Sequence, residues 1–284
     1  MSGTLYLCAT PIGNLQDMTP RVIDTLSQVD LIAAEDTSNS IKLLNHFEIK
    51  TPMTSYHEYN KVEKAKELVA KLQSGMDIAL ITDAGTPAIS DPGEVLVRMC
   101  HEAAVPVTSL PGPAALIVAL TLSGLPTRRF CFEGFLPADK KEKKQILEEL
   151  VGESRTIILY EAPHHLVRTL TELREVLGDR NVTLCRELTK KFETILPTTI
   201  DAALELYQEE EPRGEYVLVV EGKSLADKQK EAQASWEEMS IEAHMDYYES
   251  QGLSHKDAMK QVAKDRGVGK REIYQYLVQM DESV

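Results

Sequence analysis

The chain has 284 residues and a formal net charge of −14, with 31 lysines and arginines against 45 acidic residues. This length predicts two or three domains. The acidic balance argues against broad, nonspecific binding of nucleic acid, but it leaves room for a local basic groove. Hydrophobic residues make up 43% of the sequence, which is enough for sizeable cores. No stretch approaches about 18 continuous apolar residues, so we expect no membrane span.

The four cysteines are far apart and show no CxxC spacing; they are Cys8, Cys100, Cys131 and Cys185. Most of them sit in apolar runs, which predicts buried free thiols in a reducing compartment rather than a disulfide framework or a zinc site. The first four residues lead straight into a strand and lack the charged and apolar regions of a signal peptide. We therefore expect a cytoplasmic protein.

Along the first half, short apolar runs alternate with segments of helical period, which is the pattern of an α/β domain. The expected strands are 5–9, 31–34, 78–81 and 107–110. The expected helices are 20–28, 40–46, 61–74, 93–104 and a last one from 113 to 123. Thr19 followed by Pro20 is a typical helix start, with a cap residue and then proline at the first helical position.

The second half repeats the alternation after a junction at 125–129. The expected strands are 130–135, 156–160, 182–186, 192–196 and 216–220, and the expected helices are 140–150, 163–177 and 199–209. The fold class predicted is thus α/β, with one domain at 1–125 and a second at 126–223. A linker and a small helical module follow at 224–284.

The helical module has a local excess of positive charge. From 254 to 277 there are six lysines and arginines against three acids. Ser254 caps one expected helix, and Gly267 and Gly269 separate it from a second, as in a helix-turn-helix. A packing or dimerisation module and a contact with nucleic acid both explain this pattern.

Three loops of small residues, at 9–14, 82–93 and 109–115, each follow an expected strand of the first domain. Such loops form ligand crevices at the carboxyl ends of the strands in open α/β sheets. Neither a GxGxxG nor a GxxxxGK[ST] motif is present. No cluster of lysines and arginines balances phosphates, so the loops suit an adenine, a ribose and a zwitterionic tail better than a triphosphate.

Six short motifs occur in order: Ala-Thr-Pro-Ile-Gly-Asn (9–14), Ala-Glu-Asp-Thr (34–37), Thr-Asp-Ala-Gly-Thr-Pro-Ala-Ile-Ser-Asp-Pro-Gly (82–93), Pro-Gly-Pro-Ala-Ala (111–115), Tyr-Glu-Ala-Pro-His (160–164) and Cys-Arg-Glu-Leu-Thr-Lys (185–190). Over about residues 4–222 the chain resembles the tetrapyrrole-methylase-fold methyltransferases, which use S-adenosylmethionine (SAM). Within them it is similar to the ribosomal RNA small subunit methyltransferase I family. The resemblance implies two α/β domains with SAM in the cleft between them, a homodimer, and 2′-O-methylation of a cytidine in small-subunit (16S) ribosomal RNA. Because the protein is acidic, we expect the RNA to be offered in an assembled subunit, which would fix its register.

By this resemblance the SAM contacts come from the loops of both domains. The residues implied are Thr10, Pro11, Gly13, Asp83, Ala84, Gly85, Ile89, Ser90, Pro111, Gly112, Tyr160, Glu161, Ala162, Leu188, Tyr216 and Val217. The chain departs from the family pattern at two positions. Tyr59 stands where the family usually has His, and His165 stands where it usually has Arg, which removes a permanent charge because His is mostly neutral at pH 7.

Removal of a proton from a ribose hydroxyl needs a base near the methyl donor. Our first candidates are Glu187 as the base and Lys190 as the group that orients a phosphate or the hydroxyl. His57, Glu35 and Asp36 are further candidates. A surface charge or an ion pair explains Glu187 and Lys190 equally well. The candidate RNA contacts are Arg128, Arg129, Lys140, Lys141 and Lys191. No group of residues has the spacing of a metal site.

Two other functions share parts of this pattern. A tetrapyrrole C-methyltransferase of the precorrin or uroporphyrinogen type has the same fold, but it predicts a large apolar cleft with few lysines around it. A non-enzymatic SAM or nucleotide sensor with a DNA-binding tail predicts tight binding without turnover, and a salt-sensitive affinity for duplex DNA. The basic pairs and the helical tail favour RNA over both.

Overall fold

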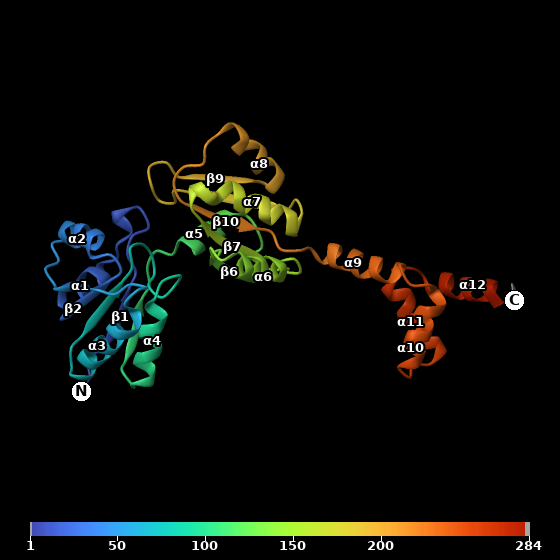
Figure 1. Ribbon diagram of the computed structural model, residues 1–284, viewed down its shortest axis with the longest axis horizontal. Coiled ribbons are helices and arrows are strands. Elements are labelled where there is room, and N and C mark those ends of the chain that lie inside the picture. Colours follow the sequence, from blue (N-terminus) through green and yellow to red (C-terminus); the bar gives the residue numbers. More distant parts are fainter. Residues whose placement is uncertain (1, 282–284) are drawn as a thin grey trace. The chain divides into compact units, whose positions relative to one another are not determined.

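The computed structural model describes residues 2–281, which form two compact units (Figure 1). Unit 1 holds the chain up to Val151 together with Arg155–Glu221, and unit 2 holds Gly152–Ser154 and the chain from Gly222 onward. Within the described part, no helix is both long and apolar enough to cross a membrane.

Unit 1 begins with a five-stranded, all-parallel sheet. Its strand order is β3 (Met53–Ser55), β2 (Leu31–Ala34), β4 (Ile78–Ile81), β1 (Leu5–Cys8) and β5 (Val107–Leu110). Helices α1 (Pro20–Gln28) and α2 (Thr37–His46) pack on one face, and α3 (Lys61–Gln73) and α4 (Gly93–Glu102) on the other (Figure 1). Every residue of β2 and β4 is buried, which explains why these strands are continuous apolar runs.

Two details of this sheet differ from the expectation. Helix α2 begins at Thr37 rather than residue 40, because the Asp36 carboxylate accepts a hydrogen bond from the Ser38 N–H at 2.7 Å and caps the helix. Strand β3 was not expected. It has three half-buried residues at the sheet edge and no apolar run to reveal it. A short 3-10 helix, η1 (Leu15–Asp17), follows the first loop.

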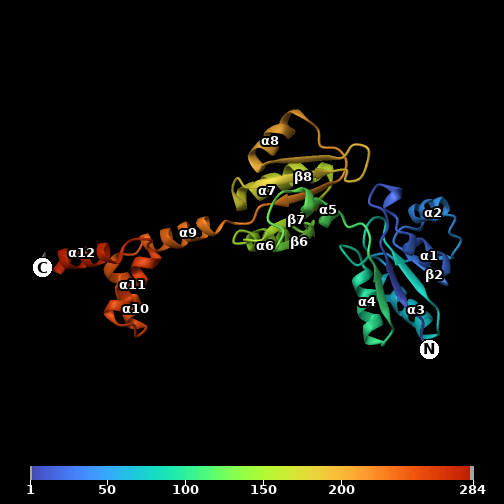
Figure 2. The same ribbon diagram turned by 180° about the vertical axis from the view of Figure 1, so that it is seen from behind.

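The second sheet is mixed, with the order β6 (Phe130–Phe135), β7 (Thr156–Glu161), β10 (Tyr216–Val220), β8 (Asn181–Arg186) and β9 (Thr194–Thr199). Strand β10 runs antiparallel to both of its neighbours, so its first residues lie where β7 and β8 end. Helices α6 (Lys140–Leu150), α7 (Pro163–Leu177) and α8 (Ile200–Glu209) pack on one face, and α5 (Ala115–Leu122) packs on the other (Figure 2).

Unit 2 consists of α9 (Leu225–Glu237), α10 (Ile241–Ser250), α11 (His255–Asp265) and α12 (Lys270–Asp281). The sequence pattern separates α11 from α12 but does not separate α10 from the segment before it. Met245, Met259, Val262 and Ile273 form a small core of their own. The Trp236 ring stacks on His244, with centroids 4.1 Å apart and planes 6° from parallel, and joins the end of α9 to this core.

Candidate functional site

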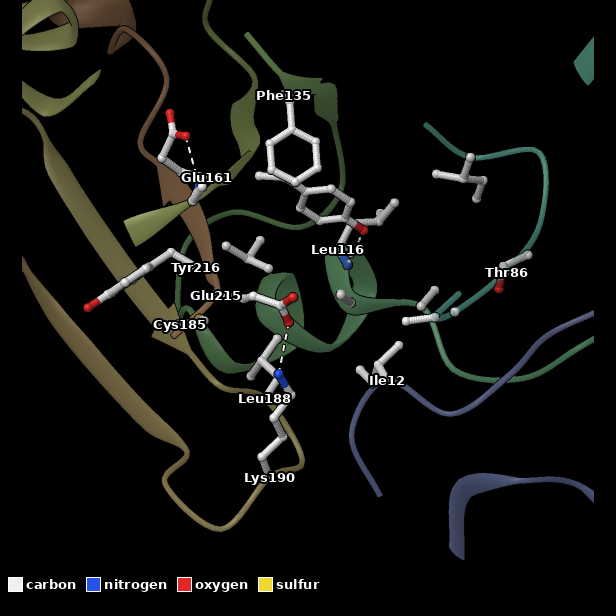
Figure 3. Close-up of a pocket in the computed structure, with 18 of the residues that line it drawn as sticks. Ile12, Thr86, Leu116, Phe135, Glu161, Cys185, Leu188, Lys190, Glu215 and Tyr216 are labelled. Carbon is white, nitrogen blue, oxygen red and sulfur yellow. Dashed lines mark hydrogen bonds and ion pairs between the residues drawn. The ribbon is translucent and has the colours of Figure 1, made fainter. Parts of the chain in front are cut away.

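Unit 1 contains a pocket of about 400 Å³, where loops of the first sheet meet strand ends of the second (Figure 3). The first half supplies Ile12, Ala84, Gly85, Thr86, Ile89, Ala114, Ala115 and Leu116, and the second half supplies Phe135, Tyr160, Glu161, Ala162, Pro163, Cys185, Leu188, Lys190, Glu215, Tyr216 and Val217. The wall is mainly apolar, and alanines and one glycine bring backbone groups close to the cavity. Its volume lies within the range of roughly 300–1,000 Å³ that is usual for cofactor sites.

The loops on the first-sheet side are fastened to one another. The Thr10 N–H donates to the Gly85 carbonyl at 2.9 Å, and the Gly85 N–H donates back to the Thr10 carbonyl at 3.0 Å. Beside this pair, a Cβ added to Gly112 would lie 2.7 Å from the Ala9 Cβ, so the loop after β5 touches the end of β1 and only glycine fits. These contacts hold Gly85 in its position in the pocket wall.

Asp91 holds the long loop after β4 in shape. Its carboxylate accepts hydrogen bonds from the N–H groups of Ala88, Ile89 and Gly93 at 3.0, 3.1 and 2.8 Å. Ala88 and Ser90 adopt φ values of +68° and +62°, a region that costs energy for residues with a Cβ. Burial raises the pKa of Asp91 in spite of the three donors. The carboxylate therefore stabilises a strained loop that carries Ile89 into the pocket wall.

Carboxylates gather behind the same loop. The Asp36 N–H donates to Asp83 at 3.2 Å, and the Thr82 hydroxyl donates to Glu35 at 2.6 Å. Partial burial and the charge of Glu35 raise the pKa of Asp83. Asp83 precedes Ala84 of the pocket wall. Among the described residues, no group of three or more His, Cys, Asp or Glu side chains is arranged to hold a metal ion.

On the second-sheet side, Tyr160 and Glu161 end strand β7. The Tyr160 hydroxyl accepts a hydrogen bond from the Leu116 N–H at 3.2 Å, which ties the start of α5 to the second sheet, and burial raises the pKa of this hydroxyl. The Glu161 carboxylate is buried and accepts from the Ala162 N–H at 2.8 Å and the Thr169 hydroxyl at 2.5 Å. Glu161 thus stabilises the first turns of α7.

An ion-pair cluster at the pocket joins Lys190 to two acids. The Lys190 ammonium lies 3.0 Å from a Glu187 oxygen and 2.8 Å from a Glu215 oxygen. Two further hydrogen bonds join Glu187 to Glu215. The Glu187 N–H donates to the Glu215 carbonyl at 2.9 Å, and the Glu215 N–H donates to the Glu187 carboxylate at 2.9 Å. Glu187 and Thr189 have φ values of +52° and +65°, so this turn is strained like the loop after β4.

The cluster fixes the charge of its members. Burial opposes the charging of Lys190, but Glu215 and Glu187 outweigh it and raise the pKa of the ammonium. Burial also acts against ionisation of Glu187, yet the Glu215 N–H and the Lys190 ammonium hold its pKa below the ordinary value. At neutral pH both groups are charged, so Lys190 is a donor there and not a base.

Comparison with known proteins agrees with this architecture. Residues 4–204 match the family described as Tetrapyrrole (Corrin/Porphyrin) Methylases. Proteins named ribosomal RNA small subunit methyltransferase I are similar over nearly the whole chain. The protein from Synechocystis is 47% identical over 98% of this chain and 99% of its own, and the one from Bacillus subtilis is 47% identical over 96% and 93%. The chain belongs to the ribosomal RNA small subunit methyltransferase I family.

Solved structures confirm the fold expected for this family. A diphthine synthase aligns with a TM-score of 0.61 at 13% identity over 78% of this chain and 91% of its own. The uroporphyrin-III-C-methyltransferase from Thermus thermophilus aligns with a TM-score of 0.55 at 17% identity over 76% and 94%. At these identities the likeness concerns the fold alone.

The residues that the sequence predicted to contact SAM fall into two groups, according to whether they line the pocket. Those that line the pocket are Ala84, Gly85, Ile89, Tyr160, Glu161, Ala162, Leu188, Tyr216 and Val217. Those that lie outside its lining are Thr10, Pro11, Gly13, Asp83, Ser90, Pro111 and Gly112. Several residues of the second group contact residues that line the pocket. Thr10 pairs with Gly85, for example, and a Cβ on Gly13 would lie 2.4 Å from the Lys190 side chain.

Of the three catalytic candidates, only Lys190 lines the pocket. Glu187 supports Lys190 from outside the lining, and the His57 N–H donates to the Asn60 side chain away from it. The ion pair that the sequence left open for Glu187 and Lys190 is present. The sequence reasoning missed Glu215. The available signal was a polar residue between Gly214 and the buried strand β10, which begins where β7 and β8 end, beside the pocket.

The candidate RNA contacts all lie on the surface of unit 1. Arg128 and Arg129 precede β6, Lys140 and Lys141 begin α6, and Lys191 follows the Lys190 turn, where its ammonium lies 5.6 Å from the Phe192 ring. All five side chains are exposed, so they are accessible to a polyanion.

Proposed function

We propose that this chain transfers a methyl group from SAM to the ribose 2′-hydroxyl of a cytidine in small-subunit (16S) ribosomal RNA. The observation that carries the proposal is the pocket. Its wall is mainly apolar, and small residues expose backbone groups to the cavity. The ion pair between Lys190 and Glu215 also lies in the lining. Similarity to ribosomal RNA methyltransferases over nearly the full length supports the choice of RNA.

The pocket residues fit SAM by their chemistry. Apolar side chains such as Ile12, Leu116 and Leu188 suit the two faces of an adenine, and the small residues Ala84 and Gly85 leave backbone groups within reach of a ribose and an amino-acid tail. Lys190 is the only lysine or arginine among the lining residues, and two acids neutralise it. This balance suits a cofactor that carries a positive sulfonium and no phosphate.

When bound, SAM supplies an electrophilic methyl group on its sulfonium. The residues then have to place the hydroxyl oxygen in line with that methyl and remove one proton. We assign the proton to Glu215, whose carboxylate lines the pocket and whose side chain is 80% exposed. The O–CH₃ bond forms as the S–CH₃ bond breaks, and the hydroxyl proton goes to the carboxylate. Lys190 holds Glu215 in place and donates to the ribose or its phosphate, and Glu187 positions Lys190.

The substrate must present its hydroxyl outside a regular duplex, so splayed or single-stranded RNA is the expected form. The exposed cations Arg128, Arg129, Lys140, Lys141 and Lys191 would bind its phosphates. We further propose that the chain works in the cytoplasm as a homodimer on an assembled subunit. Light scattering on the purified protein would test the dimer.

A labelling experiment tests the proposed function. Methyl-tritiated SAM is supplied with naked small-subunit RNA, assembled small subunits and uroporphyrinogen in parallel. We expect label in the RNA of the subunits, at one nucleotide that becomes resistant to alkaline cleavage. Label in the tetrapyrrole alone would overturn the proposal in favour of C-methylation. Tight SAM binding with no label in any acceptor would overturn it in favour of a sensor.

A further inference from the structure

Helix α11 of unit 2 carries a row of lysines that nothing in the proposed mechanism uses. Lys256, Lys260 and Lys264 follow one another at intervals of four residues, so they lie on one side of the helix, and all three side chains are exposed. We call these three residues the lysine row. The opposite side of α11 packs into the core of the unit through Met259 and Val262.

The lysine row lacks the ion pairs that the lysines of helix α3 have. In α3 of unit 1, the lysines at 61, 64, 66 and 71 all form ion pairs with glutamates. None of the lysine row pairs with an acid whose side chain the structure describes. The lysine row therefore differs from the lysines of α3, whose charges are paired along their own helix.

Three acids of α11 and α12, Asp257, Asp265 and Glu272, are engaged inside unit 2. Asp257 accepts from the Ser254 hydroxyl at 2.6 Å at the start of α11. Asp265 accepts from the Tyr248 hydroxyl at 2.5 Å and from Gln261 at 3.0 Å, and Glu272 accepts from the Gly269 N–H at 2.9 Å. These contacts hold the three acids in caps and turns, and none of them is an ion pair with the lysine row.

The start of α12 adds two more cations and an aromatic ring. Lys270 and Arg271 are exposed and have no ion pair with a described side chain. Tyr274 lies one turn further along on the same side, and it is 57% exposed. Cations for phosphates beside an exposed ring for stacking on an unpaired base are the two elements of single-stranded RNA recognition. By contrast Arg266 turns inward and donates to His244 at 3.2 Å, so it belongs to the scaffold.

We infer that the lysine row, with Lys270, Arg271 and Tyr274, is a second RNA-binding surface that engages unpaired ribosomal RNA outside the methylation pocket. The inference rests on the proposed function for its choice of RNA. In a protein with a net charge of −14, a polyanion is repelled on average, so a concentrated basic surface is needed to hold it. We expect the surface to contribute to affinity and to leave the chemical step unchanged.

The test uses the full chain and naked small-subunit ribosomal RNA, with binding measured at several KCl concentrations and no cofactor. The variant K256Q/K260Q/K264Q removes three positive charges. The control R21Q/K42Q/K50Q removes three exposed cations of unit 1 and changes the net charge equally. Each phosphate contact in single-stranded RNA contributes about 0.7 to the slope of log K against log salt, so the row variant should lose about 2 from that slope and the control almost nothing.

Turnover separates this inference from the proposed function. We expect KM for RNA to rise at least tenfold in the row variant with kcat within twofold, and Tyr274→Ala to weaken binding where Tyr274→Phe does not.

An unchanged salt slope in the row variant, or an equal loss in the control, would overturn the inference. Duplex DNA bound as tightly as RNA would also overturn it. Failure of the wild type to methylate any RNA would instead defeat the proposed function, since the binding measurements do not depend on turnover. Fluorescence of the only tryptophan, Trp236, reports whether unit 2 remains folded.

Discussion

Single residues in the Lys190 cluster have separable tasks. Glu215 faces the pocket, whereas Glu187 lies outside its lining and accepts hydrogen bonds from both Lys190 and the Glu215 backbone. The sequence pattern pointed to Glu187 and missed Glu215, although both are glutamates next to predicted strands. Only the antiparallel entry of β10 decides which of them reaches the cavity.

Substitution should separate the two acids by their kinetics. Glu215→Gln keeps the shape of the side chain and removes the proton acceptor, so we expect kcat to fall at least about a hundredfold with little change in SAM affinity. Glu187→Gln keeps one acceptor for Lys190, so we expect a loss of about tenfold or less. Glu211→Gln, an exposed acid of the same loop, is the control. A larger loss from Glu187→Gln than from Glu215→Gln would contradict the assignment.

Elements with long apolar or periodic patterns were predictable, and short or edge elements were not. The expected strand at 192–196 is wrong by two or three residues, because β9 spans Thr194–Thr199. Pro197 reads as a strand breaker, but β9 is an edge strand, where a missing N–H on the outer side costs nothing. The sequence indicates a loop of small residues after β4, yet the role of Asp91 depends on three backbone donors whose directions no sequence pattern gives.

The loop after β4 offers a test at the level of an element. Asn in place of Asp91 turns one acceptor into a donor facing the Ile89 N–H or its neighbours, so we expect about 1–3 kcal/mol of lost stability and at least tenfold weaker SAM binding. Asp139→Asn is the matched control, because Asp139 also accepts two backbone N–H groups, at the start of α6. Calorimetry should show reduced stability in both variants and weakened SAM binding only in the first. Equal SAM affinity in the two would rule out this role of the loop.

Across the whole molecule, three of the cysteines lie in three separate hydrophobic cores. Cys8, Cys100 and Cys185 are buried in different clusters, and Cys131 is half-buried in β6. Their distribution follows largely from the sequence, since most of them lie in apolar runs. What the sequence could not give is how the two sheets share one pocket, because that depends on contacts such as Tyr160 with Leu116 between distant segments.

Thiol labelling checks this arrangement. Burial raises the pKa of Cys8 and of Cys185 to about 12 and that of Cys100 to about 11, so at pH 8 almost no thiolate forms at these sites. We expect iodoacetamide to modify one thiol of the native protein, Cys131, and all four after denaturation. The variant Cys131→Ser should show no early modification. Two or more thiols reacting early in the native protein would contradict the packing described.

The central position of β10 limits how the length of this chain can change. Tyr216, Leu218 and Val220 face α6, α7 and α8, while Val217 and Val219 face α5. Deleting one residue inside the strand would exchange the two sets and carry Glu215 away from Lys190. Insertions at 210–212, in the polar connection between α8 and Gly214, would leave both sets in place. Related chains should therefore tolerate gaps before this strand and none within it.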